Sequence, residues 1–296
     1  MILLLVRKQF NLVLALVIIL GLITNFPIKA AGEREKYISL NKQQLKQGEL
    51  IIIRTENNQH IYRINFNQKK YHLYKDNNTS DFLAPIPISY WLKPGEYKLE
   101  INGEDFNMLK DIKIVPGNFR KSYLAIDSEK EEIIKPQSKE TIERKKRDNQ
   151  LINKARKNSS STRLWQGKFI WPLDGTISTP FGAIRYVNDR LQSHHSGIDI
   201  AASRGTVVKA AASGIVELAA ELLVTGNTII IDHGWNISSS YSHLNDIKVS
   251  VGQKIEKGDI IGSVGSSGFS TGPHLHWAVK VNGVFANPEW FINSLF

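Results

Sequence analysis

The sequence predicts an all-β protein in which a small β-sandwich-like domain and a larger antiparallel β-sheet domain are joined by a charged, partly helical linker. Three observations predict this class. Short apolar runs separated by turn residues occur on both sides of residues 128–163. Glycines punctuate the runs of the C-terminal half, where they mark tight turns. The segment between the halves is highly charged and has only a thin apolar stripe.

The first 31 residues (1–31) are expected to be a signal peptide or an N-terminal membrane anchor. Arg7 and Lys8 precede an apolar run from Leu12 to Thr24, and the small pair Ala30-Ala31 follows. This run is shorter than the roughly 20 residues that a bilayer span needs, although the apolar start of the chain leaves an uncleaved anchor open. Both alternatives predict that the rest of the chain is secreted, periplasmic or associated with the cell envelope, with a membrane tether if the anchor is kept.

Residues 37–126 are expected to form the β-sandwich-like accessory domain. Apolar runs at Leu50–Arg54 and His60–Phe66 read as strands, and the second run places alternate residues on one face. The run Phe82–Trp91 contains Pro85 and Pro87, which favour an edge or bulged strand. Several such strands at this spacing indicate a small sandwich. We expect His60 and His72 to be surface residues rather than metal ligands.

Net charge and cysteine usage limit the function classes. The chain has a formal net charge of +10 and no cysteine among its 296 residues. An excess of cations suits anionic partners, and the linker at 128–163 offers a basic strip for anionic envelope polymers or lipid headgroups. Nucleic acid is not expected as a partner because the export signal separates the protein from it. Without cysteine, a bound metal must be held by histidines and carboxylates.

The C-terminal domain, residues 165–296, should consist of strands without a long helix. The strand patterns in this part of the chain are Thr206–Ala211, Ile215–Leu218, Thr228–Asp232, Ile260–Val264 and His274–Val281.

Six of the eight histidines fall between positions 194 and 276. Because strand side chains alternate between faces, His274 and His276 should point the same way, so that one can bind a metal while the other reaches substrate. His195 and Asp199 supply an imidazole and a carboxylate within one short loop, and the residues alone do not decide which further histidine completes the set. Three ligands with an open fourth position are typical of catalytic zinc.

A metal held in this way favours amide hydrolysis. It lowers the pKa of a water to about 7 and polarises a carbonyl. The imidazoles that are not ligands, His243 and one of His274 and His276, can transfer protons or stabilise the oxyanion.

Residues 165–296 resemble the M23 family of zinc metallopeptidases, of the lysostaphin/LytM type. The matching phrases are Phe181–Arg185, His195–Ala201, Gly205–Ala210, Gly226–Gly234, Tyr241–Leu244, Gly268–Trp277 and Asn287-Pro288. The resemblance implies a duplicated hybrid motif fold, Zn²⁺ as cofactor and the peptides of peptidoglycan (cross-links or interpeptide bridges) as substrate. It also implies His195, Asp199 and His276 as zinc ligands, with His243 and His274 as catalytic histidines.

Other interpretations were weighed against this one. Some relatives lose key residues and act as non-catalytic wall-binding or amidase-regulating modules, whereas this chain keeps all five. We expect His194 to be a loop residue, and His233 to lie in a turn that shapes the groove. A further hypothesis is that residues 188–190 and the linker cover the cleft until they are released.

Overall fold

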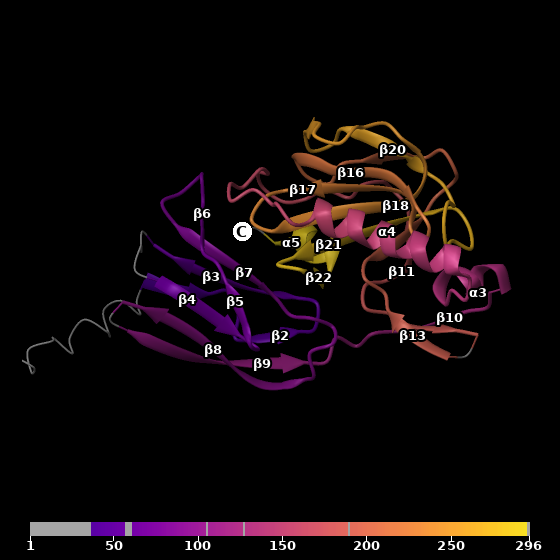
Figure 1. Ribbon diagram of the computed structural model, residues 1–296. Coiled ribbons are helices and arrows are strands. Elements are labelled where there is room, and N and C mark those ends of the chain that lie inside the picture. Colours follow the sequence, from indigo (N-terminus) through magenta and orange to yellow (C-terminus); the bar gives the residue numbers. More distant parts are fainter. Residues whose placement is uncertain (1–36, 57–60, 105, 127, 189, 295–296) are drawn as a thin grey trace, which may run out of the picture.

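The computed structural model describes residues 37–56, 61–104, 106–126, 128–188 and 190–294. It is mostly β-structure with a few helices, which confirms the predicted all-β class (Figure 1). The expected signal peptide or anchor at 1–31 lies outside the described residues. No helix within the described ranges is long and apolar enough to cross a membrane.

Two sheets form the N-terminal β domain. One runs in the order β1-β3-β7-β6 and the other in the order β2-β9-β8-β4-β5. The bounds in the first sheet are β1 Ile38–Leu40, β3 Leu50–Thr55, β7 Phe82–Pro87 and β6 Tyr74–Lys75. Those in the second are β2 Gln44–Lys46, β9 Asn107–Val115, β8 Gly95–Gly103, β4 Ile61–Phe66 and β5 Lys69–Tyr71.

Strand β3 is buried on both of its faces. Ile51 and Ile53 belong to the core between the two N-terminal sheets, whereas Leu50 and Ile52 belong to the core of the C-terminal domain. A strand covered on both sides reads as a continuous apolar run, as Leu50–Ile53 does. The two β domains therefore pack directly against each other, in addition to being connected by the linker.

The prolines of β7 lie where the sheet is incomplete. This strand pairs with β3 along all six residues, but β6 pairs only with its Phe82 and Leu83. Pro85 and Pro87 therefore have a strand neighbour on one side only, as expected for residues that lack an N–H. His72 is exposed, as its prediction requires, and His60 lies outside the described residues.

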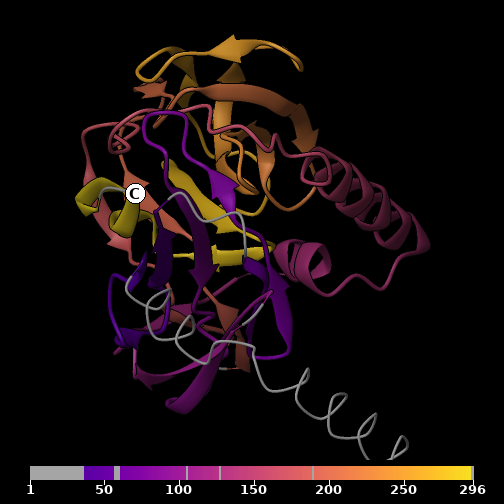
Figure 2. The same ribbon diagram turned by 90° about the vertical axis from the view of Figure 1, so that its left-hand side faces the viewer.

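Two helices occupy the charged segment between the β domains, α3 at Ser128–Ile134 and α4 at Lys139–Ala155. The side chain of Ser138 caps α4 by accepting a hydrogen bond from the backbone N–H of Thr141. Asp148 accepts a hydrogen bond from the N–H of Leu223, and Ala155 packs in a small cluster with Leu218. Helix α4 is therefore docked along the C-terminal domain (Figures 1 and 2).

The C-terminal domain is built on an antiparallel sheet in the order β11-β14-β21-β18-β17-β16-β19, with β15, β20 and β22 attached to it. The strands of the main path are β11 Thr176–Thr179, β14 Ile198–Ala201, β21 His274–Val281, β18 Ile237–Ile247, β17 Gly226–Asp232, β16 Gly214–Leu222 and β19 Lys254–Ile255. The attached strands are β15 Val207–Lys209, β20 Ile260–Val264 and β22 Val284–Ala286, and helix α5 follows at Pro288–Asn293.

A small third sheet joins the end of the N-terminal domain to the first part of the C-terminal domain. Its order is β10-β12-β13, with β10 at Lys121–Leu124, β12 at Ile184–Val187 and β13 at Arg190–His194. Strand β10 leaves the N-terminal domain and pairs in parallel with β12. The hairpin β12–β13 leads directly to His195, so the N-terminal part of the chain supports the segment that enters the candidate site.

A buried ion pair also crosses the domain boundary. The guanidinium of Arg163 lies 3.4 Å from Oδ2 of Asp76, and both side chains are almost fully buried. The guanidinium also lies over the rings of Trp165 and Trp235, and Trp235 stacks on Tyr74. Removing one partner of a buried pair is costly because it leaves the other charge uncompensated. The relative position of the two domains is therefore held by specific polar contacts.

His233 is a core residue, so the expectation that it shapes the groove is wrong. It is fully buried, Nδ1 lies 2.8 Å from the carbonyl of Ser213, and Nε2 lies 2.8 Å from the hydroxyl of Ser239. Its ring also packs against Phe169. Burial lowers the pKa of His233 to about 4, against smaller opposing effects of Ser213 and Asp232. The imidazole is therefore neutral, and its two nitrogens connect Ser213 and Ser239 by hydrogen bonds within the core.

We expect His233 to make the stability of the C-terminal domain pH-dependent. Its folded-state pKa is below the unfolded value, so its contribution is fully present above about pH 6.5 and is lost as the pH falls toward 4. The loss should approach about 3 kcal/mol. Urea unfolding of the wild type and of His233→Gln at pH 7 and pH 4.5 measures it. An equal pH dependence in the two proteins would contradict this account.

Candidate metal centre

Strand register brings the candidate ligands together. In the pairing of β14 with β21, Asp199 lies opposite His276 and Ala201 lies opposite His274. Alternation along β21 puts both histidines on the same face, as the sequence predicted. Gly197 allows the preceding turn to pass close to β21, because a Cβ at this position would lie 2.3 Å from the carbonyl oxygen of Trp277. His195 is thereby carried to the same point as Asp199.

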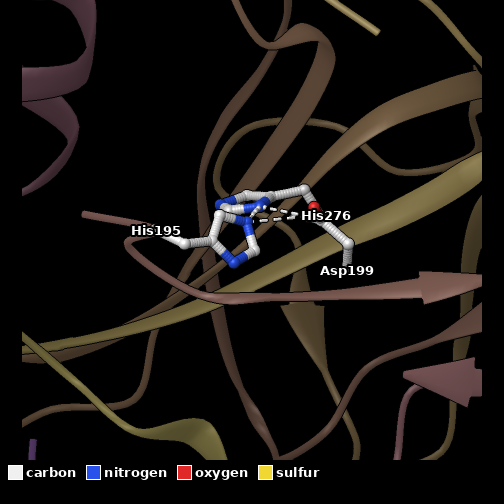
Figure 3. A group of neighbouring side chains, drawn as sticks. All are labelled: His195, Asp199 and His276. Carbon is white, nitrogen blue, oxygen red and sulfur yellow. Dashed lines mark hydrogen bonds and ion pairs between the residues drawn. The ribbon is translucent and has the colours of Figure 1, made fainter. Parts of the chain in front are cut away.

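Three ligand atoms of the predicted residues converge at this point (Figure 3). Oδ1 of Asp199 lies 2.9 Å from Nε2 of His195 and 2.8 Å from Nδ1 of His276, and the two nitrogens are 3.0 Å apart. His195 and Asp199 are buried, and His276 is partly buried. Separations of this size suit ligands that share one ion at about 2.1 Å.

The hydrogen bonds of these side chains test whether a cation fits. Nδ1 of His195 lies 3.1 Å from the carbonyl oxygen of Pro180. A carbonyl only accepts, so Nδ1 carries the proton and the lone pair of Nε2 faces the carboxylate of Asp199. Two electron-rich atoms this close repel each other unless a proton or a metal ion lies between them. The arrangement therefore fits a bound cation, and two nitrogens with one carboxylate oxygen suit Zn²⁺.

The electrostatics of Asp199 agree with this. Burial would raise the pKa of Asp199, but the interactions of its carboxylate with the neighbouring imidazoles of His195 and His276 outweigh that effect and hold the pKa well below the usual range, so Asp199 is ionised and can serve as a ligand. The second carboxylate oxygen, Oδ2, lies 3.4 Å from Nη2 of Arg185. Arg185 thereby orients the carboxylate so that Oδ1 faces the histidines.

Arg185 was not among the predicted site residues. It stands on β12, and burial lowers the pKa of its guanidinium, against an opposing effect of Asp199. The one available signal was its place at the end of the phrase Phe181–Arg185. Its contact with the carboxylate depends on the packing of the small sheet against the large one, which sequence spacing does not reveal.

His243 lies at a bulge in β18. The register between β17 and β18 shifts beside it, and its φ of 62° is in the left-handed region that non-glycine residues rarely adopt. Such a conformation costs roughly 1–3 kcal/mol and is concentrated at functional sites. Nδ1 lies 2.8 Å from the carbonyl oxygen of Ser267, so Nε2 is the unprotonated nitrogen. Burial, with the nearby His276 and His274, lowers the pKa of His243 to about 3.

His274 is held in the same way. Its Nδ1 lies 2.8 Å from the carbonyl oxygen of Gly272, so Nε2 is available, and Nε2 lies 3.8 Å from Oδ1 of Asp199. The ring centroids of His243 and His274 are 4.8 Å apart. The structure thus places two imidazoles, each anchored through Nδ1, beside the converging ligand atoms.

A cavity of about 270 Å³ opens onto this group. The cavity is lined by Arg185, by the loop 269–273 and by four of the predicted site residues, which are Asp199, His243, His274 and His276. His195 is not among the lining residues. Neither residues 188 and 190 nor the described part of the linker is among the lining residues. The cavity can hold a small polar group next to the candidate ligands. Nothing in its lining supports the hypothesis of a covering linker.

His194 is not a simple loop residue, contrary to expectation. It ends β13, its Nδ1 lies 2.8 Å from the carbonyl of Gly182, and its ring stacks on Tyr90 with centroids 5.1 Å apart. Trp91 meets the same ring edge-on at 4.5 Å. Tyr90 also packs on Phe181, which follows the Pro180 carbonyl that His195 contacts. The N-terminal domain therefore supports the segment that carries His195.

We expect Tyr90→Ala to weaken metal binding by about tenfold without abolishing it. Groups that orient a ligand from behind are typically worth 10- to 100-fold in metal affinity, and Tyr90 acts through His194 and Phe181. Competition with a chromogenic chelator measures the affinity. Tyr37→Ala removes an exposed tyrosine of the N-terminal domain that does not line the cavity, and it is the matched control. Equal affinities in the two variants would contradict the supporting role.

The fold and this donor set indicate the class: an antiparallel β protein whose sheet brings together a group of side chains that could hold one metal ion. Residues 193–288 match Peptidase family M23, and this part of the chain is an M23 peptidase domain. The family resemblance found in the sequence is therefore confirmed.

Named relatives and a solved structure agree. DD-carboxypeptidase/endopeptidase Mpg of Neisseria meningitidis serogroup B is 38% identical over 112 residues, which are 38% of this chain and 26% of that protein. Peptidoglycan DD-endopeptidase ShyC of Vibrio cholerae serotype O1 is 38% identical over 95 residues, which are 32% of this chain and 22% of that protein. The chain thus matches about a quarter of the length of these relatives. A crystal structure of a Pseudomonas aeruginosa protein described as peptidase M23 has a TM-score of 0.64 at 27% identity, covering 86% of this chain and 97% of its own.

Proposed function

We propose that the protein is a zinc-dependent endopeptidase that hydrolyses peptide bonds in peptidoglycan. The observation that carries the proposal is the convergence of the ligand atoms of His195, Asp199 and His276 beside two imidazoles with free Nε2 atoms. Membership of the M23 domain supports peptidase chemistry. Relatives named as peptidoglycan DD-endopeptidases support the substrate class.

In this proposal His195, Asp199 and His276 hold the ion. When bound, Zn²⁺ supplies Lewis acidity, which activates water and polarises a carbonyl. Arg185 keeps the carboxylate of Asp199 turned toward the histidines. The carbonyl of Pro180 fixes the tautomer of His195, so that its Nε2 lone pair is directed at the ion.

His243 and His274 are the proposed proton-transfer groups. Both present an unprotonated Nε2, since each Nδ1 donates to a backbone carbonyl. One imidazole can accept the proton of the attacking water and return it to the leaving amine. The other, once protonated, can donate a hydrogen bond to the oxyanion of the tetrahedral intermediate. The partly exposed His274 and the buried His243 offer these roles from two sides of the same cavity.

Action on peptidoglycan implies a place outside the cytoplasm, in agreement with the export signal expected from the sequence. The N-terminal membrane tether stays a prediction, because residues 1–36 lie outside the described chain. Contact between the basic linker and anionic envelope polymers is likewise a prediction.

The test is digestion of purified cell-wall sacculi by the protein, with mass spectrometry of the released fragments. We expect fragments with new peptide amino termini and intact glycan linkages, and no such release in the presence of a chelator. The identities of the new termini define the scissile bond. Binding to sacculi without any chelator-sensitive cleavage would instead support the alternative of a non-catalytic wall-binding or regulatory module.

A further inference from the structure

A second cavity lies at the carboxyl end of helix α4, where the linker and both β domains meet. Its volume is about 590 Å³. The N-terminal domain contributes Lys70 and His72, the linker contributes Arg156 and Lys157, and β21 contributes Lys280. Figure 1 shows the end of α4 directed toward the N-terminal domain. Residues that are far apart in the sequence thus bring four basic side chains and a histidine to one concave surface.

These cations are not neutralised by the described part of the protein. None of the ion pairs found among the described residues involves Lys70, Arg156, Lys157 or Lys280. The one carboxylate in the lining, Asp232, accepts hydrogen bonds from the hydroxyl of Ser159 and from the backbone N–H groups of Ser160 and Gly234. Its single negative charge faces four basic side chains, so the lining keeps an excess of positive charge.

Two of the cations are partly withdrawn from water. Arg156 and Lys280 both lie over the ring of Phe285, at 5.7 and 5.0 Å from its centroid. Nε of Arg156 is buried and has no hydrogen-bond partner within the described chain. Burial, with the charges of Arg156 and Lys69, lowers the pKa of Lys280 to about 8. A buried, unpaired donor is expensive, so the arrangement calls for an acceptor from outside.

We propose that this cavity is a binding site for a phosphate-bearing ligand, separate from the metal centre. Several cations in one cavity favour a ligand with more than one negative charge, which a single carboxylate does not supply. A phosphate group offers up to two charges and three acceptor oxygens, and a guanidinium binds it through paired N–H groups. The phosphate can belong to a soluble polyphosphorylated molecule or to the phosphomonoester headgroup of an anionic lipid.

The position of the site gives the ligand a structural effect. Lys280 is on the same strand face as His276, four residues along β21, which corresponds to about 13 Å. A ligand held by Lys70, Arg156 and Lys280 at once would tie the N-terminal domain, the linker and the peptidase sheet together. Binding should therefore raise the unfolding temperature of the full chain by mass action.

The test is calorimetric titration of the full chain with tripolyphosphate and with inorganic phosphate, and flotation with vesicles of phosphatidic acid or phosphatidylcholine. We expect saturable binding of tripolyphosphate, weakened about tenfold or more by Lys280→Gln, since a charged hydrogen bond is worth about 1.5–3 kcal/mol. Flotation with phosphatidic acid alone among the vesicles, lost in the same variant, would assign the phosphate to a lipid headgroup. Tripolyphosphate binding without flotation would assign it to a soluble ligand.

Two further variants guard against misfolding and nonspecific charge effects. Lys70→Gln alters an exposed side chain of the same cavity and should weaken binding several-fold with an unchanged melting temperature. Lys254→Gln removes an exposed lysine on β19, outside the cavity, and should leave binding unchanged. Failure of every probe to bind, or equal losses in Lys254→Gln and Lys70→Gln, would overturn the proposal.

Discussion

Asp199→Ala should remove bound zinc and lower peptidoglycan cleavage by about 10³-fold or more. Its Oδ1 is within 2.9 Å of both candidate ligand nitrogens, so its loss leaves two imidazoles without the charge that completes the site. Lewis-acid activation is worth several kcal/mol of transition-state stabilisation, which corresponds to this factor. Metal content by mass spectrometry and fragment release from sacculi measure the two effects.

The control for this variant must separate metal loss from misfolding. Asp174→Ala removes an exposed carboxylate of the same domain and should keep both zinc and activity. Asp199→Ala should retain the circular dichroism spectrum of the wild type, because Asp199 is not part of the hydrophobic core that holds the sheet together. A folded Asp199→Ala protein that still holds one zinc per chain would show that the ion is bound elsewhere.

His243→Ala and His274→Ala should keep zinc but lower kcat by about 10²- to 10⁴-fold, the range typical of lost general acid–base catalysis. Neither side chain belongs to the group of converging ligand atoms, and both reach the same cavity through Nε2. The double variant should be little worse than the poorer single variant, since groups that act as a unit are not additive. Kinetics on a synthetic stem peptide, with metal content in parallel, check the prediction.

His72→Ala is the matched control for this pair, because His72 is an exposed histidine of the N-terminal domain. It should leave kcat unchanged. Loss of zinc from His274→Ala, with zinc retained in His276→Ala, would contradict the proposed roles. It would show that His274 is the zinc ligand and that His276 is not.

Local sequence patterns predicted the strand that carries His274 and His276, but they did not predict how that strand pairs with its neighbours. Alternation placed His274 and His276 on one face of a strand, and the strand His274–Val281 has the predicted bounds. Which of the two is a ligand depends on register: Asp199 lies opposite His276 because β14 pairs with β21 across more than 70 residues. A shift by one residue would reverse every face, and spacing alone does not determine such a pairing.

The longest strand of the described chain was missed in the sequence. Strand β18, Ile237–Ile247, is rich in serine and has no alternating apolar pattern. Its serines are nevertheless buried, because the strand lies between β17 and β21 and the hydroxyls find partners there, as Ser239 does with His233. The buried position of His233 and the bulge at His243 both follow from this strand, so neither could be predicted without it.

The contacts between the N-terminal domain and the rest of the chain could likewise not be predicted from local sequence patterns. Its β-rich character was predictable from short apolar runs and turns, and the structure confirms it. The stacking of Tyr90 on His194 and the pairing of Arg163 with Asp76 join segments that no local signal connects. These contacts depend on how two finished domains fit together, which is a property of their surfaces rather than of any motif.

The most direct test of the central claim is a metal-removal cycle on the peptidase activity. The purified protein is stripped of metal with a chelator, assayed on sacculi, reloaded with one equivalent of Zn²⁺ and assayed again, with Asp199→Ala treated in parallel. We predict that stripping abolishes fragment release, that one equivalent of zinc restores it, and that the variant stays inactive at every step. Undiminished cleavage by the stripped protein would contradict the account.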